Sequence, residues 1–366
     1  MNIKSFNYIT DLKKNHSSIL KSINKVLYSG SLILGPEVEK FEKNFSKFIG
    51  TKYGIGVGNC TDAIYISLKA LNIKKGDEVI TVANTAIPTV TAIINAGAHP
   101  RFVDINESYL LDPEKIVSVI NKKTKAIIPV HLYGKTCDMR QIIDIAKKYK
   151  LKIIEDCAQS AGSTYFGKKS GSFGDVGCFS FYPTKVLGGY GDGGFITTNN
   201  KNLWRKMRRI RYMGIELKKK TKYFAIEHGT NSRLDEIQAS ILNFKLKKIS
   251  KYISSRQKNA KKYYENLHKM NIILPSNEIN KNDVYYEFVV RSKKRDKLLK
   301  KLKKNKINLK ITYPYPIYKM KPYKKFYNKN LVKTEKFSKE IFSLPVYPGI
   351  KEREIKIICN NIIKYL

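Results

Sequence analysis

The sequence predicts an α/β fold in which a large domain with a mostly parallel β-sheet is followed by a smaller α/β domain. Short apolar runs alternate with amphipathic helical runs between residues 53 and 155. This alternation is typical of βαβ units with helices on both faces of one sheet. The chain has 366 residues, of which 42% are hydrophobic, so it is long enough for two cores. We place the boundary near residue 250, which gives domains of residues 1–250 and 251–366.

The first fifty residues predict an N-terminal arm and two helices. An amphipathic run covers residues 12–28, Gly35-Pro36 interrupts it, and residues 37–49 again carry apolar side chains at helical spacing. The alternating units follow. Their expected strands are residues 53–57, 78–82, 101–103, 126–130 and 152–155, and their expected helices are residues 63–71, 88–96, 113–119 and 139–148.

A turn of small residues, Gly58-Asn-Cys-Thr-Asp62, joins the first of these strands to its helix. Free backbone N–H groups and the helix dipole converge at such a turn and form a phosphate site. Thr61 can add a hydroxyl group. Taken alone, the turn is better explained by an ordinary N-cap.

Asp156 directly follows the apolar strand that ends at Glu155. Ligands of open parallel sheets bind at the carboxyl ends of the strands. A carboxylate in this position must be paired or hydrated. It serves either as a helix cap or as the partner that keeps a cofactor's pyridinium nitrogen protonated.

Lys185 differs from most of the 70 Lys and Arg residues because its neighbours are Pro183, Thr184, Val186 and Leu187. A lysine in partly apolar surroundings can lose its proton and act as a Schiff-base nucleophile. The alternative is a surface lysine that snorkels. The glycine run that follows contains a G-x-G-x-x-G match ending at Gly194, but a β-type run comes after it instead of a helix, so we do not expect a dinucleotide site.

The second half of the chain predicts further elements of both kinds. The expected strands are residues 173–181, 195–198 and 285–291; the expected helices are residues 202–213, 237–267, 293–305 and 353–365; residues 313–316 and 342–348 are expected to be proline-constrained loops.

Composition bounds the function. The net charge is +40, but the lysines are spread along the chain without the aromatic interleaving of nucleic-acid motifs, so we expect no nucleic-acid partner. The charge would instead attract anionic substrates such as nucleotide diphosphates. No run of 18 apolar residues and no secretory signal occurs, which predicts a cytoplasmic protein without a membrane span. The five cysteines are scattered, so neither a metal site nor disulfides are expected.

Five motifs resemble those of the DegT/DnrJ/EryC1/StrS sugar aminotransferases and occur in that family's order. They are Gly58-Asn-Cys-Thr-Asp-Ala63, Pro129-Val-His-Leu-Tyr-Gly134, Glu155-Asp-Cys-Ala-Gln-Ser160, Phe179-Ser-Phe-Tyr-Pro-Thr-Lys185 and Gly229-Thr-Asn-Ser-Arg-Leu-Asp235. The resemblance extends from Gly35-Pro36 to residues 343–348. It implies a transferase of fold type I, similar to aspartate aminotransferase, with pyridoxal 5′-phosphate (PLP) as its cofactor.

The resemblance also implies roles for single residues. Lys185 would hold PLP as a Schiff base and then move a proton between substrate and cofactor. Asp156 would pair with the pyridine nitrogen, and Gln159 would lie near the ring hydroxyl. The phosphate would be held by Cys60, Thr61 and Ser180.

Further roles concern the partner and the substrate. Asn231 would reach the phosphate from the other subunit, so the resemblance implies a homodimer with its active site at the interface. Tyr182 and Tyr313 would contact the sugar or its diphosphate. The substrates would be L-glutamate and a dTDP-keto sugar.

The resemblance also bears on which sugar carbon is aminated. Enzymes of this family that aminate C4 usually carry a histidine where this chain has Tyr182. The sequence therefore resembles the branch that acts on C3 of dTDP-3-keto-6-deoxyhexoses to give 3-amino-3,6-dideoxyhexoses. A C4 aminotransferase is the alternative.

Two departures from the family pattern stand out. Many relatives have an aromatic residue near Ala86 or Ile87 that stacks on the cofactor ring, and this chain has none there. Many also have histidine where this chain has Thr312 and Tyr318.

Two further functions compete with this interpretation. Relatives that dehydrate or deaminate sugars replace the lysine with histidine, so Lys185 argues against that activity. A regulatory protein with a degenerate PLP fold would show salt-sensitive DNA binding, and the complete set of Lys185, Asp156 and Gln159 argues against it.

Overall fold

A computed structural model describes residues 3–216, 223–275, 280–327 and 331–366. Its centre is a seven-stranded sheet with the order β1-β9-β8-β5-β4-β2-β3. Only β9 runs antiparallel to its neighbours, so the predicted mostly parallel sheet is confirmed. The strands are β1 Tyr53–Val57, β2 Glu78–Val82, β3 His99–Val103, β4 Thr124–Ile127, β5 Lys152–Asp156, β8 Val176–Ser180 and β9 Gly194–Thr198; β6 Thr164–Tyr165 and β7 Lys168–Lys169 form a separate hairpin.

Helices cover both faces of this sheet because neighbouring residues of one strand point to opposite sides. Val79 of β2 belongs to one core and Ile80 to the other, and Ile154 and Ile153 of β5 divide in the same way. The helices of this part are α2 Pro36–Ile49, α3 Cys60–Ala70, α4 Ile87–Asn95, α5 Met139–Lys148, α6 Lys201–Arg211 and α7 Glu236–Leu246.

The helix predicted over residues 113–119 is wrong in type. Two short 3-10 helices, η1 Pro113–Lys115 and η2 Val117–Val119, occupy this stretch. Its C-terminal half is rich in β-branched residues, which lower α-helix propensity. Ile116 is buried while Val117 is 47% exposed, so the segment gains little from continuing as an α-helix.

The smaller part of the molecule is built on a two-stranded antiparallel sheet, β10 Phe288–Arg291 with β11 Ile341–Leu344. The predicted loop at residues 342–348 therefore begins as a strand. The helices of this part are α8 Ile249–Leu267, α9 Arg295–Lys304, α10 Val332–Glu340 and α11 Glu352–Tyr365; the 3-10 helices η3 Leu132–Gly134, η4 Ile317–Lys319 and η5 Lys321–Phe326 lie in connecting segments. Helix α10 was not predicted.

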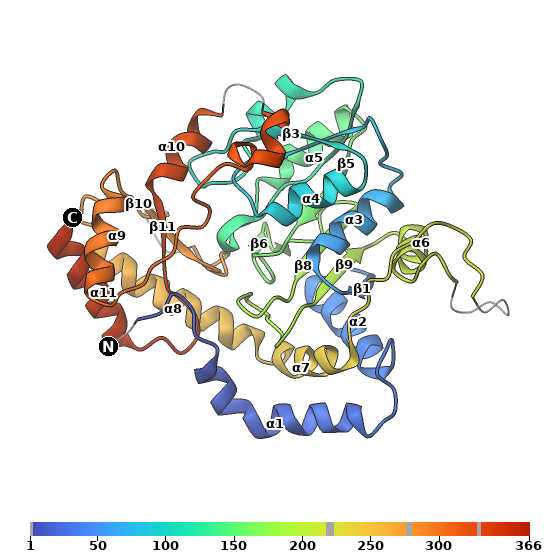
Figure 1. Ribbon diagram of the computed structural model, residues 1–366, viewed down its shortest axis with the longest axis horizontal. Coiled ribbons are helices and arrows are strands. Elements are labelled where there is room, and N and C mark those ends of the chain that lie inside the picture. The colour runs from blue at the N-terminus through green and yellow to red at the C-terminus, as the bar shows by residue number, and fades with distance from the viewer. Residues whose placement is uncertain (1–2, 217–222, 276–279, 328–330) are drawn as a thin grey trace.

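The single helix predicted over residues 237–267 is two helices. Helix α7 ends at Leu246, and Lys248, with φ −109° and ψ 2°, precedes α8. Helix α7 packs beside α1 and α2, whereas α8 extends toward the C-terminal helices (Figure 1). The predicted domain boundary near residue 250 falls at this break and stays a prediction.

An N-terminal arm connects the two parts. The backbone of Ile3 pairs with the smaller part, because its N–H donates to Lys306 O at 2.9 Å and its carbonyl accepts from Asn308 N at 3.0 Å. Helix α1, Ile9–Leu27, then lies along α7 (Figure 1). Among the described residues, no helix combines the length and apolarity that crossing a membrane requires.

Lys245 is buried where α7 meets the arm, with its Nζ 4.0 Å from an Asp11 carboxylate oxygen and 4.7 Å from the centre of the Tyr190 ring. Burial lowers the pKa of Lys245 from 10.5 to about 8, and Asp11 offsets only part of this effect. The folded protein therefore binds fewer protons than the unfolded chain between these pH values, so Lys245 makes the folded state relatively more stable as pH rises.

We expect Lys245→Met to remove this pH dependence. The difference in unfolding free energy between wild type and variant should shift by about 2 kcal/mol in favour of the wild type between roughly pH 8 and pH 10. Urea unfolding at several pH values measures this difference. A difference that stays constant over this interval would contradict the assignment.

Candidate active site

Four strand ends meet at one edge of the large sheet. In the antiparallel register Ser180 at the end of β8 pairs with Gly194 at the start of β9, and Gly194 pairs with Val57 at the end of β1. Asp156 at the end of β5 pairs with Cys178 of β8. The sheet thus brings Ser180, Asp156 and the turn after β1 to the same edge.

The turn after β1 is open to an anion. The side chain of Asn59 caps α3 by accepting from the Asp62 N–H at 2.9 Å, so the N-cap expected of this turn is present. Within the described residues, no hydrogen bond uses the N–H of Cys60 or Thr61. Two unused N–H groups at a helix N-terminus are what a phosphate needs, so the cap and the phosphate site are compatible.

Gly194 lies directly against this turn. A Cβ at this position would come within 2.4 Å of the Asn59 carbonyl carbon and 2.8 Å of the Cys60 nitrogen. Only glycine therefore lets β9 start beside the turn. This explains one glycine of the run that follows Lys185.

Cys60 lies within electrostatic range of two other predicted residues. Burial raises the pKa of the Cys60 thiol well above its ordinary value, Asp156 raises it further, and Lys185 acts in the opposite direction. The side chain of Cys60 therefore stays a neutral thiol. The charges of Asp156 and Lys185 therefore both act on the Cys60 thiol.

Asp156 is 4% exposed and held by two hydrogen bonds. The Thr89 hydroxyl donates to its Oδ2 at 2.8 Å, and the Ala158 N–H donates to its Oδ1 at 3.1 Å. Thr89 in turn shares a 3.0 Å hydrogen bond with Thr85. Sequence reasoning missed Thr89, because nothing local in the sequence shows that α4 reaches across to the end of β5.

Gln159 links three segments. Its Oε1 accepts from the Tyr133 N–H at 2.8 Å, and its Nε2 donates to the Tyr313 hydroxyl at 3.0 Å. The Tyr133 hydroxyl donates to the carbonyl of Thr312. Burial raises the pKa of Tyr313 well above its ordinary value, so its phenol stays protonated. The two predicted residues Gln159 and Tyr313 are thus direct partners.

The amino group of Lys185 lies 4.7 Å from the centre of the Tyr286 ring. The lysine is half-buried and lines a cavity of about 40 Å³. The other walls come from the N-terminal arm, residues on both sides of Lys185, helices α7 and α8, and the loop after β11: Phe6, Asn7, Tyr8, Asp11, Pro183, Val186, Lys245, Tyr252, Arg256, Tyr347 and Pro348. The arm therefore forms one side of the space beside the lysine.

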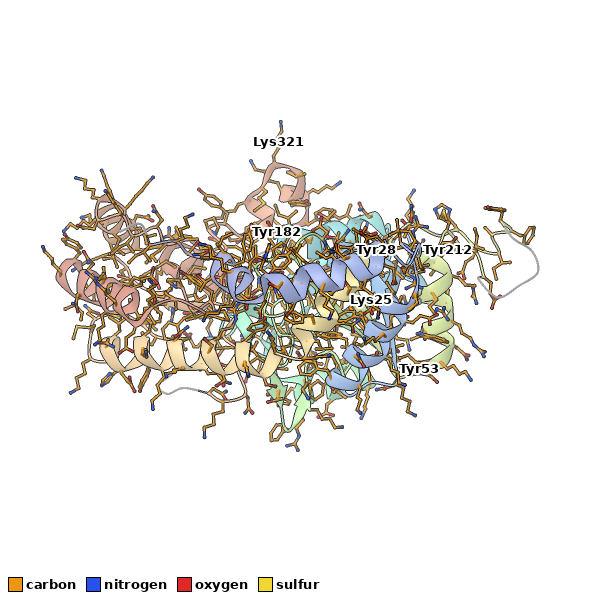
Figure 2. All side chains as sticks on the ribbon, turned by 90° about the horizontal axis from the view of Figure 1, so that it is seen from below. Lys25, Tyr28, Tyr53, Tyr182, Tyr212 and Lys321 are labelled. Atoms are coloured by element: carbon orange, nitrogen blue, oxygen red, sulfur yellow. The ribbon has the colours of Figure 1, made fainter. Side chains whose placement is uncertain are left out.

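Two predicted site residues lie outside this group. Tyr182 is 52% exposed, and in the view of Figure 2 it lies in the upper half of the molecule, from which Lys321 also projects. Asn231 is exposed and bridges to Tyr212. A role in a second subunit's site requires an exposed Asn231, but that role stays a prediction.

Buried His131, Glu155 and Cys157 form a cluster that could hold a metal. Glu155 already accepts the N–H groups of Gly171, Phe173 and Gly174 at 2.7–2.8 Å. Its Oε2 also lies 2.9 Å from His131 Nε2, while His131 Nδ1 accepts from the Cys137 N–H. The carboxylate is fully used by the fold, so these residues fix the strand that carries Asp156 instead of offering a metal site.

A family model describes most of this chain. Residues 13–363 match the DegT/DnrJ/EryC1/StrS aminotransferase family.

Three relatives match over nearly their whole length. One is a dTDP-3-amino-3,6-dideoxy-alpha-D-galactopyranose transaminase of Aneurinibacillus thermoaerophilus, 42% identical over 349 residues and 95% of each chain. Another is a dTDP-3-amino-3,4,6-trideoxy-alpha-D-glucose transaminase of Micromonospora megalomicea subsp. nigra, 40% identical over 353 residues and 94% of each chain. The third is a UDP-2-acetamido-2-deoxy-3-oxo-D-glucuronate aminotransferase of Pseudomonas aeruginosa, 40% identical over 354 residues, 95% of this chain and 97% of the relative.

Solved structures also match this chain over nearly its whole length. DesV of S. venezuelae superimposes with a TM-score of 0.95 at 32% identity, over 100% of this chain and 98% of that chain. NtdA of Bacillus subtilis, with the cofactor PMP bound, superimposes with a TM-score of 0.90 at 34% identity, over 96% of this chain and 82% of that chain.

Proposed function

We propose, from the premise that this chain belongs to the DegT/DnrJ/EryC1/StrS family of PLP-dependent sugar aminotransferases, that it transfers the amino group of L-glutamate to C3 of a dTDP-3-keto-6-deoxyhexose. The product would be a dTDP-3-amino-3,6-dideoxyhexose for surface-glycan or related biosynthesis. The observation that carries the proposal is the convergence of Lys185, Asp156, Gln159 and the open α3 turn at one sheet edge.

The residues at this edge fit PLP. The unused N–H groups of Cys60 and Thr61 suit its phosphate, and Gly194 lets β9 start directly against the turn that carries them. The buried carboxylate of Asp156 suits its ring nitrogen. Thr89 and Ala158 already donate to this carboxylate, but both donors are neutral. Burying a carboxylate costs free energy unless a positive group also pairs with it.

PLP, when bound, supplies an electron sink. The chain supplies the rest. Asp156 keeps a proton on the ring nitrogen, and Thr89 fixes the direction of the carboxylate. Lys185 Nζ takes a proton from the carbon that loses its hydrogen and later returns one. One lysine serves both half-reactions, which predicts ping-pong kinetics.

Tyr182 supports C3 as the position of amination, because it stands where family members that act at C4 usually carry histidine. Two relatives at 40–42% identity are transaminases of dTDP-3-amino sugars. The Pseudomonas relative, at 40% identity, is named for a UDP-linked 3-oxo sugar, so the nucleotide needs a direct test. A C4 aminotransferase is the alternative.

We also propose that the enzyme is a homodimer with Asn231 reaching the partner's cofactor phosphate. Asn231 is exposed, as this requires. At the C-terminal end of α1 and just after it, the apolar side chains of Leu27, Tyr28 and Leu32 are 52%, 92% and 49% exposed. A contiguous exposed apolar patch is typical of a protein contact surface. Sedimentation of the purified protein tests whether it is a dimer. If Asn231 reaches the partner's phosphate, Asn231→Ala should remain a dimer but bind the cofactor more weakly.

The decisive experiment for the reaction follows the visible spectrum of the PLP-loaded protein. L-glutamate should bleach the cofactor band, and a dTDP-3-keto-6-deoxyhexose should restore it. Restoration by the 4-keto isomer alone would move the enzyme to C4. Restoration by a UDP-linked 3-keto sugar alone would replace dTDP. A protein without a cofactor band that bound DNA in a salt-sensitive way would instead be a regulatory protein.

Thr89→Val removes the hydroxyl group that donates to Asp156. A hydrogen bond to a charged group contributes about 1.5–3 kcal/mol, so we expect the affinity for PLP to fall about tenfold or more. Equilibrium titration with PLP measures this. Thr89→Ser keeps the donor and is the control. Equal affinities of the two variants would show that the hydroxyl group does not orient Asp156.

A further inference from the structure

The contact between Lys185 and Tyr286 has no role in the function proposed above. Tyr286 stands two residues before β10 and is 9% exposed. The Lys185 amino group lies over its ring, 4.7 Å from the centre. The Tyr286 hydroxyl lies 3.0 Å from that of Thr184, the residue next to the lysine. Ring and hydroxyl of one tyrosine therefore both contact the lysine segment.

The backbone of Tyr286 is held in place by two neighbouring residues. Arg256 donates from Nη1 to the Tyr286 carbonyl at 3.1 Å. Gly134 packs so closely that a Cβ there would lie 2.6 Å from the Tyr286 nitrogen, and its carbonyl accepts from the Val284 N–H at 2.9 Å. The backbone of Tyr286 cannot move away from the lysine segment without disturbing these contacts, and the bond between the Tyr286 and Thr184 hydroxyls holds the end of the ring.

The face of the Tyr286 ring is the cation–π partner of the Lys185 amino group. A second lysine, Lys310, lies 5.7 Å from the same ring centre, but its charge is paired with Glu287. Within the described part of the chain, no carboxylate forms an ion pair with Lys185. An aromatic face holds an ammonium group without the permanent charge of a carboxylate. The ring therefore binds the Lys185 amino group weakly enough for the group to move to the cofactor.

We propose that Tyr286 is the rest site of the Lys185 amino group, which the ring holds whenever the lysine is not attached to the cofactor. Tyr286 is then a positioning residue. This inference rests on the proposed function, because an aminotransferase lysine must leave the cofactor and return to it in every turnover. A lysine held at one rest site stays within reach, whereas a lysine without it samples solvent-facing rotamers.

The test uses the cofactor-free, full-length protein. Trace acetylation with acetic anhydride at one near-neutral pH, read by peptide mass spectrometry, gives the labelling rate of each lysine. Tyr286→Leu and Tyr286→Met both remove the ring, and the unbranched methionine provides a second variant if leucine packs poorly. Tyr286→Phe keeps the ring and loses the hydroxyl. Tyr252→Leu is the matched control, since Tyr252 lines the same cavity but bonds to Asp11.

Both ringless variants should label Lys185 about three- to tenfold faster, the range expected for a lost cation–π contact. Tyr286→Phe and Tyr252→Leu should stay within about twofold of the wild type. In the loaded enzyme, kcat of the ringless variants should fall while KM for the keto sugar changes little. Unchanged Lys185 labelling in both ringless variants would overturn the proposal. So would an equal increase at Lys245, because it would mean that the cavity had merely opened.

Failure of the proposed function would look different. A wild-type protein that bound no PLP would refute the aminotransferase reaction. Its labelling rates would still measure whether Tyr286 holds Lys185.

Discussion

Lys185→Ala should abolish covalent attachment of PLP and reduce turnover by at least about 10⁴-fold. The lysine is the covalent link and also the group that moves the proton, and proton transfer alone accounts for about 10²–10⁴-fold. Borohydride reduction followed by mass spectrometry detects the attached cofactor, and a glutamate-dependent assay measures turnover. Lys185 is the lysine whose charge acts on Cys60, at the turn proposed to hold the phosphate, so we expect no other lysine to replace it.

Lys245→Met is the control for this experiment. Lys245 lines the same cavity, yet it pairs with Asp11 of the arm. We expect that variant to keep its attached cofactor. Attached cofactor or full turnover in Lys185→Ala would remove Lys185 from the mechanism.

Asp156→Asn should slow both half-reactions by about 10²–10⁴-fold. An amide has nearly the shape of the carboxylate but cannot hold a proton on the ring nitrogen, so the cofactor loses much of its capacity as an electron sink. Single-turnover absorbance changes with glutamate, and separately with the keto sugar, measure the two steps. The loss should appear in both.

Asp175→Asn is the matched control, because this carboxylate accepts from the Ile153 N–H near the start of the same strand, at the opposite end from Asp156. It should change stability without changing the single-turnover rates. Equal slowing by both variants would mean that Asp156 acts only through the fold.

The sequence predicts those parts of the fold whose signals are local. The ranges 53–57, 78–82 and 139–148 agree with β1, β2 and α5 to the residue, because apolar periodicity and the bounding polar or glycine residues lie within each segment. The break between α7 and α8 escapes this reasoning, because helical periodicity continues across it. Residues 342–348 are expected to be a loop because they contain Pro345. This expectation misses strand β11, whose residues are all buried.

The residues of the site also fall into those with a local sequence signal and those without one. Lys185, Asp156 and Gln159 stand in motifs that a reader of the sequence can find. Thr89 acts on Asp156 across 67 positions of sequence, and Tyr286 contacts the lysine segment across about a hundred. No local pattern encodes such contacts, since tertiary packing alone creates them. Where many relatives carry the aromatic residue that stacks on the cofactor ring, this structure has Ala86, which is partly buried, and Ile87, which is 44% exposed.

The pairing of Ile3 with the smaller part has a practical consequence for making the protein. Ile3 is 1% exposed and bonded through both its N–H and its carbonyl, and only three residues later the chain lines the cavity beside Lys185. An affinity tag joined at the N-terminus would start next to a backbone pairing that also positions one wall of the site. A tag at the C-terminus, after α11, avoids that wall, so enzyme purified in this way is the better choice for every kinetic comparison described above.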